Sequence, residues 1–342
     1  MRRNLCSQTC WEGASQPMKR RILGKTELDV PVLSFGASSL GSVFRDIDRD
    51  EGIRTVHAAV DAGMNYIDVS PYYGLTKAET VLGEAIRSLP RSSYILSTKA
   101  GRYGENEFDF SRQRILNSVQ ESLNRLHTDY IDILFLHDVE FVPAEIIVEE
   151  AFPTLLRLKE QGVIRHAGIC GLPLPLFEKV LPQIDADAII SYCHYSLNDT
   201  SLLSLLPLLE KKEVGLVNAS PLSMGLLSTR GAPDWHPADE RVKQLCLKAA
   251  RFCAEQGSDI AKLAVQFSTA NEQIPTTLVS SANQRNIINN ATWIEEPINQ
   301  GLLDEVLRIL APLHNETWSS GRPEYNTKPS NTTAQASKGE QR

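Results

Sequence analysis

The feature that most constrains the fold is an alternation, repeated eight times, between a short apolar run and a longer amphipathic stretch. A short apolar run is typical of a buried parallel strand, and apolar residues at helical spacing indicate a helix that packs on one face. Strands that alternate with helices form a parallel sheet with right-handed crossovers. The predicted strands span residues 32–35, 65–68, 94–98, 131–136, 164–169, 188–192, 214–219 and 276–279.

Eight such units are the number that closes a (β/α)8 barrel. Two short runs that flank a turn predict a hairpin before the first strand, at residues 21–31, and further helices follow near the end of the chain. The fold class is therefore α/β, a (β/α)8 TIM barrel with an N-terminal hairpin and extra C-terminal helices. The predicted helices span residues 50–62, 77–88, 111–126, 145–161, 174–181, 201–212, 239–256, 260–269, 284–290 and 302–310.

A doubly wound open sheet is the structural alternative. Such a sheet usually carries G-x-G-x-x-G after its first strand, and the corresponding segment here, residues 36–41, reads Gly-Ala-Ser-Ser-Leu-Gly. Its spacing does not match, and no G-x-x-x-x-G-K-[ST] segment occurs. Dinucleotide or phosphate binding by either of these loops is therefore disfavoured.

Both ends of the chain differ in composition from its centre. Residues 1–18 show no periodicity, and we predict a disordered leader; the alternative, an organellar targeting peptide, is weakened by Glu12 and by the scarcity of arginine after Arg3. Residues 319–342 are rich in Ser, Thr, Asn, Gln, Gly and Pro, which predicts a disordered tail. One barrel domain is expected between them, at residues 19–318.

Composition narrows the range of partners. A net charge of −7 and a pI near 5.6 provide no basic surface for nucleic acid or an anionic membrane. No apolar run approaches the ~18 residues that a membrane-spanning helix needs. The six cysteines of the 342-residue chain include no C-x-x-C pair, which fits a reducing compartment and predicts a cytoplasmic protein. The oligomeric state is not indicated.

Polar residues that end three consecutive predicted strands are the candidate chemistry. Active sites of parallel barrels lie at the carboxyl ends of the strands. Asp68 ends the second strand, Lys99 follows the third and His137 follows the fourth, while Tyr72 and Tyr73 lie in the loop after Asp68. Each residue also has a structural interpretation, since a lysine can simply pair with a carboxylate and a histidine can be a hydrogen-bonded core residue.

This combination suits proton transfer coupled to hydride transfer. A tyrosine has an ordinary pKa of about 10, and a neighbouring lysine ammonium favours its phenolate form. A carboxylate such as Asp68 would hold the lysine, and a neutral histidine would orient the substrate oxygen. These parts suit oxidation of an alcohol or reduction of a carbonyl with a nicotinamide cofactor. They do not suit a metal site, because H-E-x-x-H is absent and His137-Asp138 alone is not a ligand set.

The chain resembles the aldo-keto reductases between about residues 19 and 318. The segments that carry the resemblance are Asp-Val-Ser-Pro-Tyr-Tyr-Gly at 68–74, Ser-Thr-Lys at 97–99 and Leu-His at 136–137. The resemblance implies a catalytic tetrad and favours the tyrosine that directly precedes the glycine. The implied catalytic residues are Asp68, Tyr73, Lys99 and His137.

Within the family the likeness narrows to the plant-type L-galactose dehydrogenases, on Cys-Gly-Leu-Pro-Leu at 170–174, Ile-Ser-Tyr-Cys-His-Tyr at 190–195 and Ala-Ser-Pro-Leu-Ser-Met-Gly-Leu-Leu at 219–227. It implies NAD-dependent oxidation of the C1 hydroxyl of an aldose, with L-galactose giving L-galactono-1,4-lactone for an ascorbate-type pathway. The alternatives are D-arabinose or L-fucose 1-dehydrogenation, a broad NADPH-dependent carbonyl reductase, and a cofactor-binding regulatory subunit without turnover.

The resemblance also implies where the cofactor lies. Positions after the seventh strand would hold the pyrophosphate, and Ser280 and Asn286 stand where cations often bind the 2′-phosphate of NADP. Two missing cations favour NAD, because a 2′-phosphate is held by charge-assisted donors, while the adjacent Arg285 keeps NADP as an alternative. The implied cofactor-binding residues are Ser220, Leu222, Ser280, Ser281, Asn286 and Asn290.

Overall fold

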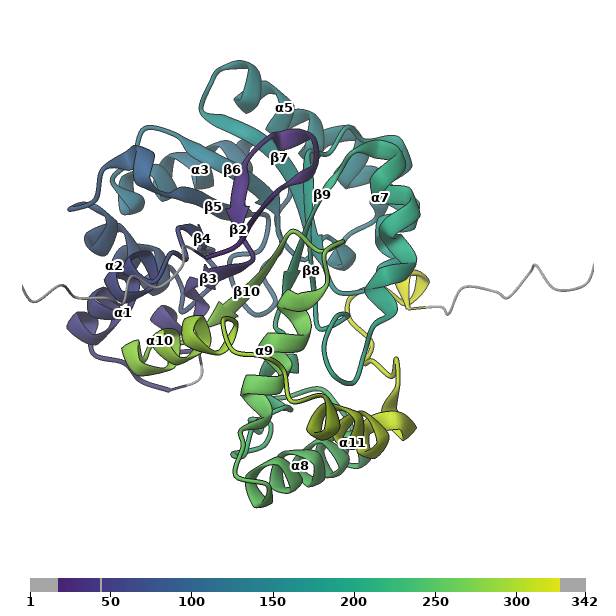
Figure 1. Cartoon of the computed structure of the whole chain (residues 1–342). Coiled ribbons are helices and arrows are strands. Elements are labelled where there is room, and N and C mark those ends of the chain that lie inside the picture. The colour runs from purple at the N-terminus through teal and green to yellow at the C-terminus, as the bar shows by residue number, and fades with distance from the viewer. Residues whose placement is uncertain (1–17, 44, 327–342) are drawn as a thin grey trace, which may run out of the picture.

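The computed structural model describes residues 18–43 and 45–326. Eight parallel strands form a closed barrel in the order β10-β3-β4-β5-β6-β7-β8-β9, and helices surround it (Figure 1). The predicted (β/α)8 architecture is therefore confirmed. The barrel strands are β3 (Leu33–Gly36), β4 (Tyr66–Asp68), β5 (Ile95–Ala100), β6 (Ile131–Leu136), β7 (Ile164–Gly171), β8 (Ala188–Tyr192), β9 (Gly215–Ala219) and β10 (Thr276–Ser280).

The predicted hairpin closes one end of the barrel. Its strands β1 (Arg20–Ile22) and β2 (Asp29–Pro31) pair antiparallel. Leu23, in the turn between them, is fully buried in the cluster of side chains that fills the barrel interior. This packing requires the glycine at 215, because a Cβ there would lie 2.7 Å from the Leu23 side chain.

Several helices begin at side chains that cap their first turn. Asp48 accepts a hydrogen bond from the backbone N–H of Glu51, and Ser111 accepts one from that of Arg114. Such caps satisfy amide groups that have no partner within the helix. The helices are α1 (Arg49–Asp61), α2 (Lys77–Ile86), α3 (Arg112–Leu126), α4 (Ala144–Ile146), α5 (Phe152–Glu160), α6 (Leu174–Val180), α7 (Leu206–Lys212), α8 (Glu240–Glu255), α9 (Ile260–Ala270), α10 (Gln284–Trp293) and α11 (Gln300–Leu310).

Prolines divide two of the predicted helices. The segment predicted as one helix at 145–161 has a π-helical turn, Ile147–Ala151, between α4 and α5. The segment predicted at 201–212 begins with a 3₁₀ turn, Ser201–Leu205, before α7. Pro153 and Pro207 lie at the start of α5 and α7. Because proline has no N–H to donate to the preceding turn, the regular hydrogen-bond ladder cannot run through either position.

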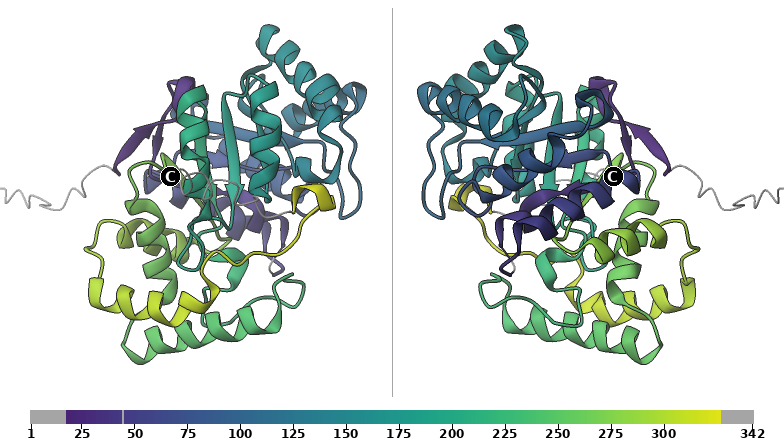
Figure 2. Two further views of the ribbon diagram at one scale, coloured as in Figure 1. Left: turned by 90° about the vertical axis from the view of Figure 1, so that its right-hand side faces the viewer. Right: turned by 90° about the vertical axis from the view of Figure 1, so that its left-hand side faces the viewer.

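The extra C-terminal helices form a layer beside the barrel. Figures 1 and 2 show α8 and α11 side by side, apart from the ring of barrel helices. Cys246 and Cys253 of α8 are both buried in the apolar cluster between them, and both are free thiols. None of the helices in residues 18–43 and 45–326 is long and apolar enough to cross a bilayer.

The predicted start of the tail at residue 319 is wrong. Residues 319–326 pack against the barrel, and Tyr325 is only 1% exposed. Gly321 has φ +66°, and its backbone passes so close to Glu140 that a Cβ would lie 2.3 Å from the Glu140 carbonyl oxygen. Composition missed this segment because it is held by a few separate contacts, made by Tyr325, by Ser320 and by the backbone. Residues 327–342, and the predicted leader except Met18, lie outside the described residues.

Candidate active site

The structure brings the four predicted catalytic side chains to one rim of the barrel. Asp68 ends β4, Lys99 lies near the end of β5, and His137 directly follows β6. Lys99 Nζ donates to Asp68 Oδ2 at 2.5 Å and to the Tyr73 hydroxyl at 3.2 Å. The rings of Tyr73 and His137 meet edge to face, with centroids 5.6 Å apart. Lys99 therefore connects the carboxylate directly to the phenol.

The turn that presents Tyr73 depends on two glycines. Gly74 has φ +61°, and a Cβ on it would lie 2.1 Å from the Gly41 carbonyl oxygen. A Cβ on Gly41 would in turn lie 2.6 Å from the carbonyl group of Tyr73. The two loops pack backbone to backbone, which leaves no space for a side chain on either. This contact fixes the position from which Tyr73 points toward Lys99.

The Lys99–Asp68 pair is buried and fully hydrogen-bonded. Lys99 also donates to the Val69 carbonyl at 2.9 Å, and Asp68 Oδ1 accepts from Ser97 Oγ at 2.7 Å. Burial alone lowers the pKa of Lys99, but the attraction of Asp68 and then of Tyr73 outweighs it, so its pKa lies above the ordinary value. Lys99 is therefore an ammonium ion at neutral pH.

Tyr73 and His137 are shifted in opposite directions, both by burial. Burial raises the pKa of the Tyr73 phenol, and the Lys99 ammonium lowers it only in part. Lys99 thus acts in the direction expected from the sequence, but burial has the larger effect. Burial also lowers the pKa of His137 to about 3, although Asp138 opposes this shift. The imidazole is neutral across the physiological range.

The two adjacent tyrosines have different partners. The Tyr72 hydroxyl accepts from Arg102 Nη2 at 3.0 Å, and the Arg102 guanidinium lies 3.8 Å from the centre of the Tyr72 ring. Tyr73 is the tyrosine that contacts Lys99. The role of Tyr73 as proton donor and acceptor stays a prediction, and of the two tyrosines it is Tyr73 that lies against the lysine.

Four polar residues beside the tetrad were not among the predicted site residues. Arg102 Nη1 donates to Asp138 Oδ2 at 2.5 Å, and the Tyr192 hydroxyl lies 3.4 Å from both Asp138 Oδ1 and Glu140 Oε1. The available signal was proximity in sequence, since Asp138 directly follows His137 and Arg102 lies three residues after Lys99. Only the fold shows that the four residues are connected.

His137, Asp138 and Cys170 could provide ligand atoms for a metal ion, since these atoms lie within 4.8 Å of one another. Three features oppose cation binding there. Asp138 is already paired with Arg102, and burial raises the pKa of the Cys170 thiol well above its usual value. The Lys99 ammonium adds positive charge near the same cluster. The donor set therefore favours a proton-transfer site.

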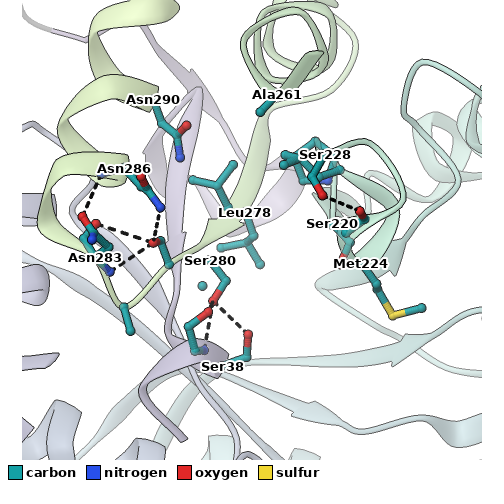
Figure 3. A pocket seen from close by; sticks show the side chains of 18 of the residues that line it. Ser38, Ser220, Met224, Ser228, Ala261, Leu278, Ser280, Asn283, Asn286 and Asn290 are labelled. Carbon is teal, nitrogen blue, oxygen red and sulfur yellow. Dashed lines mark hydrogen bonds between the residues drawn. The ribbon is translucent and has the colours of Figure 1, made fainter. Parts of the chain in front are cut away.

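A cavity of about 750 Å³ extends from Asp68 and Tyr73 to the N-terminal end of α10. Figure 3 shows Asn286 and Asn290 on one side of it and Ser220 and Met224 on the other. All six residues predicted to bind the cofactor line this cavity: Ser220, Leu222, Ser280, Ser281, Asn286 and Asn290.

The lining of the cavity suits a dinucleotide. Its size is in the range of ligand sites, about 300–1,000 Å³. The first turn of α10, whose N–H groups are capped by Asn283, places the positive end of a helix dipole at this end of the cavity, which favours phosphate oxygens. Ser280 Oγ is held by Ser38 Oγ and Ser39 N at 2.9 and 3.0 Å, and Asn286 Nδ2 donates to Ser281 Oγ at 3.3 Å. Hydroxyl and amide groups thus dominate the end of the cavity next to α10.

Two arginines, Arg45 and Arg230, were missed as lining residues of this cavity. Arg45 is paired with Glu51 at 2.5 Å, which balances its charge. Arg285, the cation that sequence reasoning considered, is not among the residues that line the cavity. The loop after β3 carries Arg45, so its place beside α10 depends on barrel closure between β3 and β10.

Comparison with known proteins agrees with this geometry. Residues 32–310 match the family model of the aldo/keto reductase family. The chain is 46% identical over 310 residues to an L-galactose dehydrogenase from Arabidopsis thaliana, covering 88% of this chain and 97% of the relative. It is 36% identical over 290 residues to a D-arabinose 1-dehydrogenase from Saccharomyces cerevisiae, covering 78% and 86%.

Solved structures show the same fold. The holo form of aldo-keto reductase AKR11C1 from Bacillus halodurans superposes with a TM-score of 0.71 at 26% identity, covering 91% of this chain and all of that one. On the family match, the relatives and the barrel, this chain belongs to the aldo/keto reductase family and is an oxidoreductase.

Proposed function

We propose that the protein oxidises the C1 hydroxyl of an aldose, with NAD as hydride acceptor and L-galactose, converted to L-galactono-1,4-lactone, as its substrate. The observation that carries the proposal is the buried Lys99 ammonium, which joins Asp68 to the Tyr73 hydroxyl beside a neutral His137. The similarity to an L-galactose dehydrogenase and to a D-arabinose 1-dehydrogenase supports an aldose as substrate.

In this proposal each side chain has a separate task. Tyr73, as the phenolate, takes the proton of the C1 hydroxyl, and Lys99 stabilises the phenolate from 3.2 Å. Asp68 holds Lys99 in place, and the neutral His137 donates a hydrogen bond to the sugar oxygen. When bound, NAD supplies the acceptor for the hydride from C1 and a positive ring charge that favours the phenolate.

The proposed reaction balances in bonds, electrons and protons. The C1–H bond breaks and its electron pair leaves with the hydride, while the O–H proton passes to Tyr73. A C=O bond forms at C1, which makes the ring form of the sugar a lactone. Two electrons are transferred, and one proton is left for release to solvent.

Substitution of Tyr73 by phenylalanine tests this mechanism. Tyr73→Phe should abolish turnover while leaving the Kd for NAD unchanged, because the ring remains and only the proton-transferring oxygen is lost. Tyr72→Phe is the matched control, since Tyr72 bonds to Arg102 and not to Lys99. Turnover by Tyr73→Phe close to that of the unsubstituted protein would remove Tyr73 from the mechanism.

We further propose that NAD is preferred to NADP. The neutral Ser280 and Asn286 occupy the end of the cavity next to α10, and Arg45 there is already paired with Glu51. Asn286→Arg should therefore raise kcat/KM with NADP relative to NAD, because it adds a charge-assisted donor for the 2′-phosphate. A higher kcat/KM with NADP in the unsubstituted protein would contradict the proposal.

D-arabinose or L-fucose is the second candidate substrate, favoured by the 36% identity to the D-arabinose 1-dehydrogenase. A panel of L-galactose, D-arabinose, L-fucose and a small aliphatic alcohol, each assayed with NAD and with NADP, separates the candidates by kcat/KM. The same panel detects a broad NADPH-dependent carbonyl reductase when it is run in the direction of reduction.

We also propose a cytoplasmic location. It is supported by four cysteines of the described ranges, Cys170, Cys193, Cys246 and Cys253, all of which are buried free thiols. Imaging of the full-length chain with a C-terminal tag tests this, and an organellar signal would favour the targeting alternative for residues 1–18.

A further inference from the structure

Ser70 is a buried serine at the active site that has no place in the tetrad. It lies two residues after Asp68, in the turn that carries Tyr73, and it is fully buried. Its Oγ lies 2.9 Å from His137 Nδ1. The same Oγ accepts a hydrogen bond from the backbone N–H of Tyr72 at 3.1 Å. One hydroxyl thus connects the tyrosine loop to the catalytic histidine.

The chemistry of a neutral imidazole makes this contact informative. One ring nitrogen carries the proton and the other is an acceptor, and the partner of one nitrogen decides the state of the other. A serine hydroxyl can donate one hydrogen bond and accept others. Ser70 Oγ already accepts a hydrogen bond from the Tyr72 N–H, so its hydroxyl proton still needs an acceptor. An unprotonated His137 Nδ1 provides that acceptor.

The charges around the other nitrogen favour the same tautomer. His137 Nε2 lies 3.7 Å from Asp138 Oδ2, and Asp138 is held in place by Arg102. A carboxylate at this distance stabilises the positive hydrogen of an Nε2–H group and destabilises the lone pair of an unprotonated Nε2. Burial and the Lys99 ammonium on β5 both lower the pKa of His137 and so disfavour the imidazolium. The ring is therefore in one of its two neutral forms.

We propose that Ser70 is a positioning residue that fixes His137 as the Nε2–H tautomer, so that Nε2 donates a hydrogen bond to the substrate oxygen. This inference rests on the proposed function for its consequence in catalysis. With Nε2–H, the histidine binds the oxygen of the C1 hydroxyl and leaves its proton to Tyr73. With Nε2 unprotonated, the histidine would compete with Tyr73 for that proton.

The first test is spectroscopic and needs no substrate. The full chain is labelled with ¹⁵N at histidine, and two-bond ¹H–¹⁵N correlations report which ring nitrogen carries the proton. The His137 signal is assigned by its loss in His137→Gln. The expected result is an unprotonated Nδ1 and a protonated Nε2 between pH 6 and 8. A protonated Nδ1 in the unsubstituted protein overturns the proposal.

The second test uses Ser70→Ala, with Ser118→Ala as the matched control. Ser118 is a buried serine on the outer helix α3, so its loss removes the same hydroxyl group away from the site. Ser70→Ala should lower kcat for the aldose about 10- to 100-fold, by analogy with the loss of a group that orients a metal-bound histidine. The Kd for NAD should not change, because Ser70 is not among the residues that line the 750 Å³ cavity.

The readouts separate a positioning role from a structural one. In Ser70→Ala the Nδ1–H form should appear in the correlation spectrum, and Ser70→Thr, which keeps the hydroxyl, should restore the original tautomer. Unchanged kcat and tautomer in folded Ser70→Ala would overturn the proposal. If the alanine variant does not fold, Ser70→Cys, a weaker donor, replaces it with the same expectations. Absence of aldose turnover in the unsubstituted protein would contradict the proposed function and leave the tautomer result standing.

Discussion

Asp68 and Glu140 are both buried carboxyl groups at the same rim of the barrel, and their surroundings differ. Asp68 Oδ2 accepts from the Lys99 ammonium at 2.5 Å. Within residues 18–43 and 45–326, Glu140 Oε1 accepts only from neutral groups, at 2.9 Å from Ser320 Oγ, 3.3 Å from Leu172 N and 3.4 Å from Tyr192 OH. Burial, with a further contribution from Asp138, raises the pKa of Glu140 to about 8.

The difference shows that burial by itself does not decide what a carboxyl group does. A buried carboxylate with a cation beside it stays charged and can fix that cation for catalysis. A buried carboxyl group with neutral partners keeps its proton and acts as a hydrogen-bonding anchor. Glu140 anchors the segment at residues 319–326, because its backbone oxygen also accepts from Arg322 N at 2.9 Å. The following predictions test this difference between Asp68 and Glu140.

Removal of the cation from the Asp68 site should have the largest effect. Lys99→Met leaves a buried carboxylate unpaired, which costs about 3–5 kcal/mol of unfolding free energy. It should also lower kcat by at least about 100-fold, since in the proposed mechanism Tyr73 loses the group that stabilises its phenolate. Urea denaturation and steady-state assays measure the two effects.

A double-mutant cycle supplies the control for this prediction. In Lys99→Met/Asp68→Asn no buried charge is left unpaired, so the double variant should lose less stability than the sum of the two single variants. Additive losses would mean that the pair is not coupled in the way that the 2.5 Å contact implies.

Neutralisation of Glu140 should have an effect on stability that depends on pH. Its ordinary pKa is 4.5 and its folded value is about 8, so between these values the folded chain holds a proton that the unfolded chain has lost. This contribution to stability is therefore lost as pH rises from about 4.5 to 8, by up to about 1.4 kcal/mol for each pH unit. Glu140→Gln removes this pH-dependent contribution, because the amide does not ionise.

The measurement is Tm at several pH values. The Tm of Glu140→Gln relative to the unsubstituted protein should rise from pH 5 to pH 8. Glu149→Gln, at an exposed glutamate of the following π-helical turn, is the matched control and should show no such trend. A Tm difference that is flat with pH would mean that Glu140 is ionised throughout the range.

Removal of one hydroxyl from the anchor should have the smallest effect. Ser320→Ala loses one hydrogen bond to Glu140 and should lower the unfolding free energy by about 1 kcal/mol, with kcat unchanged. Ser319→Ala, at the exposed neighbour, should change neither quantity. A fall in kcat for Ser320→Ala would show that the segment at 319–326 acts on the catalytic site as well as on stability.

Much of the fold was predictable because burial follows a period along the chain. Strand β6 was predicted with the observed bounds because Ile131–Leu136 is nearly all apolar, and all six residues are buried. The order of the strand ends then placed Asp68, Lys99 and His137 on one rim. The segment at 319–326 was missed because it is held by single contacts, such as that between Ser320 and Glu140, 180 positions apart.

The sequence by itself determined that eight β-then-α units close a barrel, and that the polar residues at the ends of three strands meet at its rim. Only the tertiary structure decided which groups are charged there. It gave Asp68 a lysine and, among the residues that the structure describes, gave Glu140 neutral partners; it also placed Arg102 against Asp138 and Arg45 beside α10. Ionisation depends on desolvation and on partners from distant parts of the chain, and neither follows the periodicity that specifies helices and strands.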